Sequence, residues 1–113
     1  MARRRPGTLF PLEVRILQTG AAMEGSFYGF GIAHELAQDD NEGLIAHGTL
    51  YKALSRMTTA GLLEAEWEDP SISETEGRPR RRLYRLTAEG VRALSTHESQ
   101  QRTAVAVTRM GLA

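Results

Sequence analysis

The hydrophobic pattern between residues 46 and 68 predicts a helix that leads directly into a strand. Apolar residues recur there at the three- and four-residue spacing of one buried helical face: Leu50, Ala53, Leu54 and Met57. Gly61 follows the last of them, at a position where helices commonly end in a left-handed residue. Apolar and acidic residues then alternate over positions 63–68, with the period of a half-buried strand.

The opposite face of this predicted helix is polar. It is made of Thr49, Tyr51, Lys52, Ser55, Arg56 and Thr59. A helix with one apolar and one polar face buries the first in the core of the protein. The second face is therefore free to bind a partner.

A second extended run, Arg82–Leu86, can pair with the strand at 63–68. Residues 69–81 between the two are rich in Pro, Gly, Ser and charged residues, as loops are. We therefore expect a β-hairpin with a long irregular tip, and we call this hairpin the wing (residues 63–86).

Two further helical patterns precede this region. Leu12, Ile16 and Leu17 predict a first helix that ends between residues 20 and 25. A second helix is predicted from about Gly29, with its apolar residues at helical spacing: Phe30, Ala33, Leu36 and Ala37. Leu44 and Ile45 leave room for a very short strand before the polar-faced helix.

A last helix is predicted to start after the wing. Thr87 is a suitable N-cap, and Glu89 lies in the first turn, where the helix dipole favours negative charge. The apolar residues of this helix form a seam with a polar middle: Val91, Leu94, Val105 and Leu112.

These elements have the layout of a winged helix-turn-helix. In that fold the second helix of the motif enters the DNA major groove and the wing lies along the DNA backbone. The predicted fold is therefore mainly α-helical with a small β-hairpin. The polar-faced helix is the expected recognition helix.

Two groups of residues carry a resemblance to a known family. They are Gly48-Thr-Leu-Tyr51, Leu54, Arg56, Gly61-Leu-Leu-Glu64 and Trp67 in the first group, and Arg80-Arg-Arg-Leu-Tyr-Arg-Leu-Thr87 and Gly90 in the second. Together they resemble the PadR-like family of bacterial transcriptional regulators, over about residues 14–94. Members of that family often differ at four positions, with Ser at Ala46, Pro at Lys52, an aromatic residue at Leu83 and His at Tyr28.

The resemblance implies a cytoplasmic, dimeric repressor that occupies a two-fold symmetric operator. It allows for release of the DNA by a small hydrophobic effector. Three segments follow: a basic N-terminal arm expected to be disordered (residues 1–8), a winged helix-turn-helix DNA-binding domain (9–86) and a C-terminal dimerisation helix (87–113). The resemblance places the dimer contacts on the first and last helices, at Leu12, Ile16, Val91, Leu94, Val105 and Leu112.

Composition limits the alternatives. A chain of 113 residues with 41% hydrophobic and 25% charged residues is typical of one soluble globular domain. No run approaches the ~20 apolar residues that cross a bilayer, and the basic start is not followed by the apolar segment of a secretory signal. The absence of cysteine excludes disulfides and thiolate metal sites, which fits a cytoplasmic protein.

The formal net charge of +0 argues, by itself, against strong nucleic-acid binding. The distribution of charge changes that view. Arginines gather on the predicted wing, at Arg78, Arg80, Arg81, Arg82 and Arg85, and again at residues 3–5. A charge run is usually a solvated face, but its place on a wing favours a role in DNA binding.

The expected DNA contacts of the recognition helix are His47, Gly48, Thr49, Tyr51, Lys52 and Arg56. Thr49 and Tyr51 lie in the first turn, which comes nearest to base edges. For Tyr51 the alternative is packing against the wing. Lys52 and Arg56 are expected to contact phosphates. For Lys52, contact with a guanine base is an alternative.

On the wing, the expected contacts are Arg78, Arg80 and Arg82. Alternation along the strand puts Arg80 and Arg82 on one side and Arg81 on the other, where we expect it to pair with a glutamate. Either Tyr84 with Leu86 or Leu83 with Arg85 faces inward. We expect Trp67 to be a core or wing-packing residue.

The sequence also bears on two other classes of function, enzymes and protein-binding modules. An enzyme is disfavoured because the serines and histidines are scattered singly and no phosphate-binding glycine loop is present. His34, His47 and His97 fall on separate elements, so neither a metal nor a cofactor is expected. A winged helix that binds only other proteins is the stronger rival, and it would show exposed apolar residues where the polar face lies.

Overall fold

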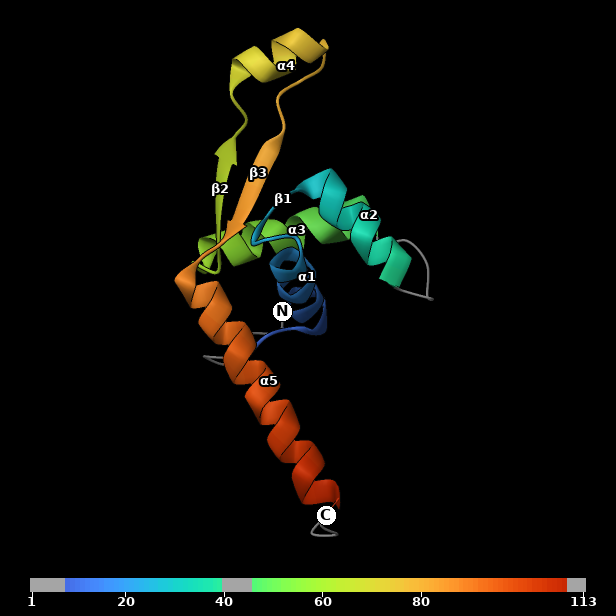
Figure 1. Ribbon diagram of the computed structural model, residues 1–113, viewed down its shortest axis with the longest axis vertical. Coiled ribbons are helices and arrows are strands. Elements are labelled where there is room, and N and C mark those ends of the chain that lie inside the picture. The colour runs from blue at the N-terminus through green and yellow to red at the C-terminus, as the bar shows by residue number, and fades with distance from the viewer. Residues whose placement is uncertain (1–7, 40–45, 110–113) are drawn as a thin grey trace.

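The structure is a computed structural model that describes residues 8–39 and 46–109. Three predictions fall outside these residues: most of the basic arm, the short strand at Leu44 and Ile45, and the dimer contact at Leu112. The described elements, in order, are α1 (Pro11–Ala22), β1 (Ser26–Tyr28), α2 (Gly29–Asp39), α3 (His47–Thr59), β2 (Leu63–Trp67), α4 (Pro70–Glu76), β3 (Arg82–Leu86) and α5 (Ala88–Arg109). Figure 1 shows them as a helical body from which the wing and α5 extend in opposite directions.

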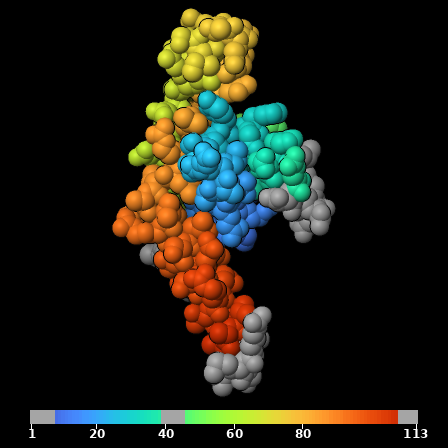
Figure 2. Space-filling model, in the orientation of Figure 1, coloured from blue at the N-terminus to red at the C-terminus, as the bar shows by residue number. Residues whose placement is uncertain are grey.

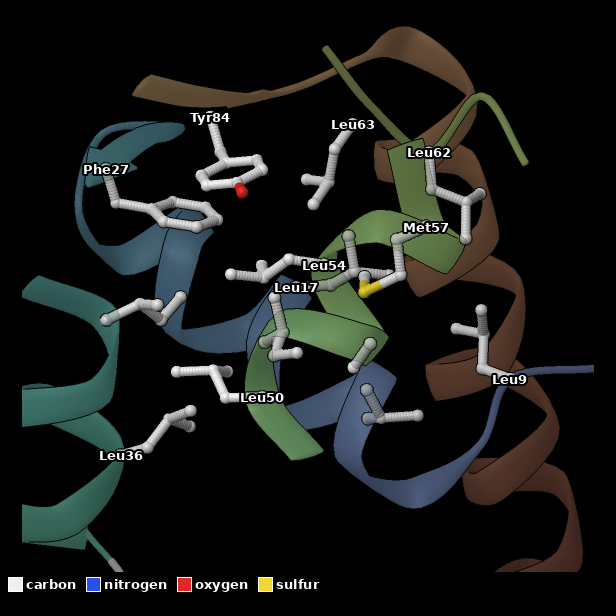
Figure 3. Close-up of a cluster of buried hydrophobic side chains, with 14 of the residues drawn as sticks. Leu9, Leu17, Phe27, Leu36, Leu50, Leu54, Met57, Leu62, Leu63 and Tyr84 are labelled. Atoms are coloured by element: carbon white, nitrogen blue, oxygen red, sulfur yellow. The ribbon is translucent and has the colours of Figure 1, made fainter. Parts of the chain in front are cut away.

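The helix α3 forms as its apolar pattern predicts. Leu50, Ala53, Leu54 and Met57 have no exposed surface. They pack against α1, α2 and the sheet in one hydrophobic core (Figure 3). Gly61 takes a positive φ of 82° just after α3, as expected for the residue that ends a helix and turns the chain into β2.

The sheet has three antiparallel strands in the order β1–β3–β2, not the two of the predicted hairpin. The extra strand is β1, in which Phe27 lies opposite Tyr84 and stacks its ring on that residue at a centroid distance of 5.9 Å. Three residues directly before a helix are too few to display a strand period, so the pattern did not reveal β1.

The tip of the wing is a helix, α4, where a loop was predicted. Asp69 caps it by accepting the backbone N–H of Ser71 at 2.9 Å, and Pro70 occupies the first turn. Gly77 ends it in the left-handed conformation. Asp69, Pro70 and Gly77, which the sequence suggested as loop residues, therefore mark the start and end of a short helix.

The start of α5 is fixed to the body and its end is not. As predicted, Thr87 is the cap: its Oγ1 accepts the N–H of Gly90 at 3.0 Å and donates to the carbonyl of Gly61 at 2.6 Å. A side chain at position 90 would lie 2.2 Å from the Leu62 carbonyl oxygen, so glycine is required for this approach. The rest of α5 leaves the body, which gives the molecule a long axis of 60 Å (Figure 2).

The order of helices and the antiparallel wing confirm the predicted winged helix-turn-helix with a C-terminal helix. α2 and α3 form the helix-turn-helix pair, and β2 and β3 form the wing.

Candidate nucleic-acid interface

The predicted contact face of α3 is exposed along its whole length. His47, Gly48, Thr49, Tyr51, Lys52 and Arg56 all lie at the surface. Ala46 provides no side-chain cap at the start of this helix. Instead, the His47 ring stacks on Tyr51 one turn later, with the ring centroids 6.2 Å apart.

Tyr51 packs on the start of α2. A methyl group added to Gly29 would lie 2.8 Å from both the Tyr51 ring and its hydroxyl oxygen. Glycine at this position therefore lets the first turns of α2 and α3 touch. Tyr51 remains 42% exposed, so its ring joins the two helices and still faces outward.

Arg56 was predicted to reach a phosphate, but the structure commits much of its side chain to α1. Its Nε donates to Glu13 Oε2 at 2.9 Å, and its guanidinium lies over the Phe10 ring at 5.1 Å. Glu13 is fully buried and also accepts the Phe10 N–H at 2.8 Å. A buried carboxylate is costly unless it is paired, so Arg56 serves α1 as well as the surface of α3.

The wing has an inner face, which we define as the side directed toward the helices. Leu63, Ala65 and Trp67 of β2 lie on it, directly opposite Leu86, Tyr84 and Arg82 of β3. Tyr84 is buried and Leu86 packs against the core, which confirms the first of the two predicted arrangements.

Arg80 and Arg82 share this inner face at its outer end. Both guanidiniums lie over the Trp67 ring, at 5.5 Å for Arg80 and 5.0 Å for Arg82. Their placement on one side agrees with the alternation predicted from the sequence. Trp67 is 56% exposed, so it is a wing-packing residue and not part of the core.

Tyr84 lies near both Arg82 of the wing and Tyr51 of α3. Burial raises the pKa of its phenol, whereas the neighbouring Arg82 guanidinium lowers it and nearby Tyr51 raises it. Arg82 of the wing and Tyr51 of α3 are thus both close enough to Tyr84 to affect its titration. Tyr51 also contacts Gly29, and the adjacent Tyr28 pairs with Leu83 of β3, so the start of α3 lies near the wing.

The outer face of the wing, which points away from the helices, holds its arginines in ion pairs. Arg85 donates to Glu66 at 3.0 Å. Arg78, predicted to contact DNA, donates from both terminal nitrogens to Glu68, at 2.6 and 2.9 Å, and from Nε to Glu76 at 2.5 Å. These hydrogen bonds from Arg78 hold the pKa of the Glu68 carboxyl below its ordinary value. The guanidinium of Arg78 is consequently occupied within the wing.

The glutamate partner predicted for Arg81 is taken by Arg78. Arg81 instead donates its backbone N–H to Glu68 at 3.4 Å and places its guanidinium over the Tyr28 ring at 5.5 Å. Tyr28 also donates its hydroxyl to Glu68 at 3.4 Å. Arg81 lies on the side of the strand opposite Arg80 and Arg82, as predicted. The helix α4 at the wing tip, however, places Arg78 next to Glu68, and Arg78 forms the ion pair.

Two of the predicted dimer contacts, Ile16 and Leu94, lie in the hydrophobic core of the subunit. Ile16 has no exposed surface and Leu94 only 8%, so neither offers a side chain to a partner. Leu12 is half-buried against the core. By contrast, Val91 and Val105 are 54% and 48% exposed on α5.

Sequence reasoning missed Glu13, Glu68 and Tyr28. Glu13 gave one signal, an acidic residue within the apolar stripe of the first helix, because a carboxylate buried there needs a cation or hydrogen-bond donors as partners. Within residues 8–39 and 46–109, no cluster of acidic, histidine or cysteine side chains is arranged to hold a metal ion. No helix in this part of the chain is long and apolar enough to cross a membrane.

The chain matches a family model over residues 20–96, and that model is described as the transcriptional regulator PadR-like family. A PadR family regulator from Eggerthella lenta is 27% identical, with a TM-score of 0.65 over 89% of this chain and 87% of that one. A PadR family regulator from Clostridium difficile is 26% identical, with a TM-score of 0.67 over 88% and 98% of the two chains.

A PadR-like regulator from Bacillus cereus shares the fold at 23% identity, with a TM-score of 0.65 over 88% of this chain and 89% of that one. Among curated proteins, none matches the chain in sequence. Because the family model covers well over half of its residues, this chain belongs to the PadR-like family of transcriptional regulators.

Proposed function

We propose that this protein is a homodimeric repressor that binds a two-fold symmetric DNA operator through α3 and the inner face of the wing. The observation that carries the proposal is the proximity of the start of α3 to the wing. Tyr51 contacts Gly29, and the adjacent Tyr28 pairs with Leu83, the neighbour of Arg82. A recognition helix and a wing need this relation to reach the major groove and the adjacent phosphates together.

Within this proposal, the first turns of α3 read the DNA. Thr49 and Tyr51 contact base edges or phosphates, with Lys52 beside them on the exposed face. Arg56 contributes from a guanidinium that Glu13 already orients. The exposed side chains of α3 are polar apart from the Tyr51 ring, which favours DNA over a purely protein-binding module.

Dimerisation is assigned to α5. Residues 99–107 of this helix are exposed on all sides, and isolated helices are marginally stable in water. Val91 and Val105 are 54% and 48% exposed, lie on the same face of α5 and supply apolar surface for a second copy. Release by a small hydrophobic effector belongs to the same proposal, because an apolar seam between subunits is the type of surface that such a ligand enters.

A fluorescence-anisotropy titration tests the DNA-binding part. The protein is titrated against a duplex from upstream of its own gene and against a shuffled duplex of the same length. We expect tighter binding to the native duplex, and we expect Tyr51→Ala and Lys52→Ala to reduce that preference. Equal affinity for both duplexes at every salt concentration would contradict sequence-specific regulation from this site.

Analytical ultracentrifugation tests the dimer. Val105→Asp places a charge in the proposed seam and is expected to give a monomer, because a buried unpaired charge is strongly unfavourable. Ile72→Asp is the matched control, since Ile72 is also exposed, at 47%, but lies on the wing tip. A Val105→Asp protein that remains dimeric would refute this interface.

A further inference from the structure

We infer that Trp67 is a positioning residue for DNA binding, which holds the guanidiniums of Arg80 and Arg82 in the orientation that a phosphate requires. The inference rests on the proposed function and deepens it. It assigns to the indole ring a role beyond packing the wing, although the ring need not touch the DNA.

The first observation is the geometry of the three side chains. Trp67 ends β2 and lies directly opposite Arg82, the first residue of β3. Arg80 lies two residues before Arg82, outside the strand, and still places its guanidinium over the same ring. One indole ring therefore contacts two arginines, Arg82 from β3 and Arg80 from the segment that precedes β3.

The second observation is that Arg80 and Arg82 have no carboxylate partner within the described residues. Arg78 and Arg85 of the wing form ion pairs with glutamates. Within residues 8–39 and 46–109, no carboxylate forms an ion pair with Arg80 or Arg82. Both guanidiniums lie over the Trp67 ring, and Arg82 also interacts with the Tyr84 hydroxyl. Their charge is therefore not neutralised by the described part of the protein.

The third observation is the exposure of Trp67. An indole that is 56% exposed contributes little to the core, so burial does not explain its presence at the end of β2. A cation–π contact with a ring uses no carboxylate, so a guanidinium held in this way keeps N–H donors for other partners. The ring thus restricts two long side chains, and the donors that Arg82 does not direct at Tyr84 stay available, with those of Arg80, for phosphate oxygens.

The size of the effect follows from the strength of such stacking. At an exposed site one cation–π contact corresponds to about a two- to fivefold change in an equilibrium constant. Two contacts to one ring should therefore change DNA affinity by about five- to twentyfold. The loss in Trp67→Ala should come with a smaller salt dependence, because less well-held arginines neutralise phosphates less completely.

A double-mutant cycle tests the inference, with anisotropy titrations of a fluorescein-labelled duplex at low salt. The proteins are the wild type, Trp67→Ala, Arg80→Ala/Arg82→Ala and the triple variant. We expect Trp67→Ala to weaken binding in the wild-type background and to have little further effect once both arginines are absent. Trp67→Phe keeps an aromatic face and should recover part of the affinity.

Other outcomes have distinct meanings. An equal loss from Trp67→Ala in both backgrounds would overturn the inference, because the ring would then act on DNA directly or through the fold. No loss in the wild-type background would also overturn it. Thermal melting of each variant shows whether a loss of DNA affinity reflects unfolding. If Trp67→Ala is unfolded, the DNA affinity of Trp67→Phe relative to the wild type tests the inference instead. A wild type that binds neither the native nor the shuffled duplex would refute the proposed function itself, and the inference with it.

Discussion

The two faces of the wing are built from alternate residues of the same strands, yet they differ in what their arginines do. On the inner face, Arg80 and Arg82 place their guanidiniums over the Trp67 ring. On the outer face, Arg85 and Arg78 are paired with Glu66 and Glu68. The charge of an arginine cluster therefore says little until each side chain is assigned to a face.

This difference explains how a chain with a formal net charge of +0 can present a positive surface. The strand places its acidic residues on the outer face, because Glu64 and Glu66 alternate with Ala65 and Trp67. The inner face is left with unneutralised arginines. Local separation of charge, and not the total, decides whether phosphates are attracted.

Removing the two inner arginines should have the largest effect. Arg80→Ala/Arg82→Ala is expected to weaken DNA binding by at least about tenfold at low salt, because two phosphate contacts are lost. Arg85→Ala is the matched control, since Arg85 is also exposed but lies on the outer face and pairs with Glu66. Anisotropy titrations measure both, and equal losses would erase the distinction between the faces.

Arg78→Ala should act on the wing tip and not on DNA contacts. It leaves the buried Glu68 carboxylate without its bidentate partner. The Glu68 N–H, which donates to the Arg81 carbonyl at 2.8 Å, should then exchange faster with deuterium than in the wild type. The salt dependence of DNA binding should stay the same. A drop in that dependence as large as the one from Arg80→Ala would place Arg78 on the DNA.

Acid should loosen the same tip. The pKa of Glu68 is lowered in the folded protein from its ordinary value of 4.5, so its pairing stabilises the wing above that pH. This contribution is lost as the pH falls through the lowered pKa. Because Trp67 is the single tryptophan, its emission should change over that acidic range in the wild type and stay flatter in Glu68→Gln. Identical titrations of the two proteins would contradict the assignment.

The smallest effect is expected from the acidic residues of the outer face. Glu64→Gln removes a negative charge that the sheet separates from the proposed DNA site. Screening over a Debye length of about 10 Å at 0.1 M salt limits the expected gain in affinity to about twofold or less. A much larger gain, measured in the same titrations, would indicate that the outer face also lies near DNA.

Local pattern was enough to predict the core of the fold. The stripe of α3, the left-handed Gly61 and the Thr87 cap each depend on neighbouring residues, and all were confirmed. β1 was missed because three residues carry no period. α4 was missed because Asp69, Pro70 and Gly77 read equally as loop residues and as helix boundaries.

The candidate site was harder to predict, because its ion pairs join residues far apart in the chain. Glu13 and Arg56 are 43 positions apart, and no periodicity connects them. The same holds for Tyr28 and Glu68, 40 positions apart. A run of arginines predicts a basic wing, but only the fold determines which of these arginines form ion pairs with carboxylates.

The slope of log Kd against log salt concentration tests the account most directly. It should be measured for the wild type, Arg80→Ala/Arg82→Ala and Arg85→Ala on the same duplex. Each phosphate contact adds about 0.9 to this slope, so we expect the double variant to lose about 1.8 and Arg85→Ala to match the wild type. Equal slopes for all three proteins would contradict the assignment of DNA binding to the inner face of the wing.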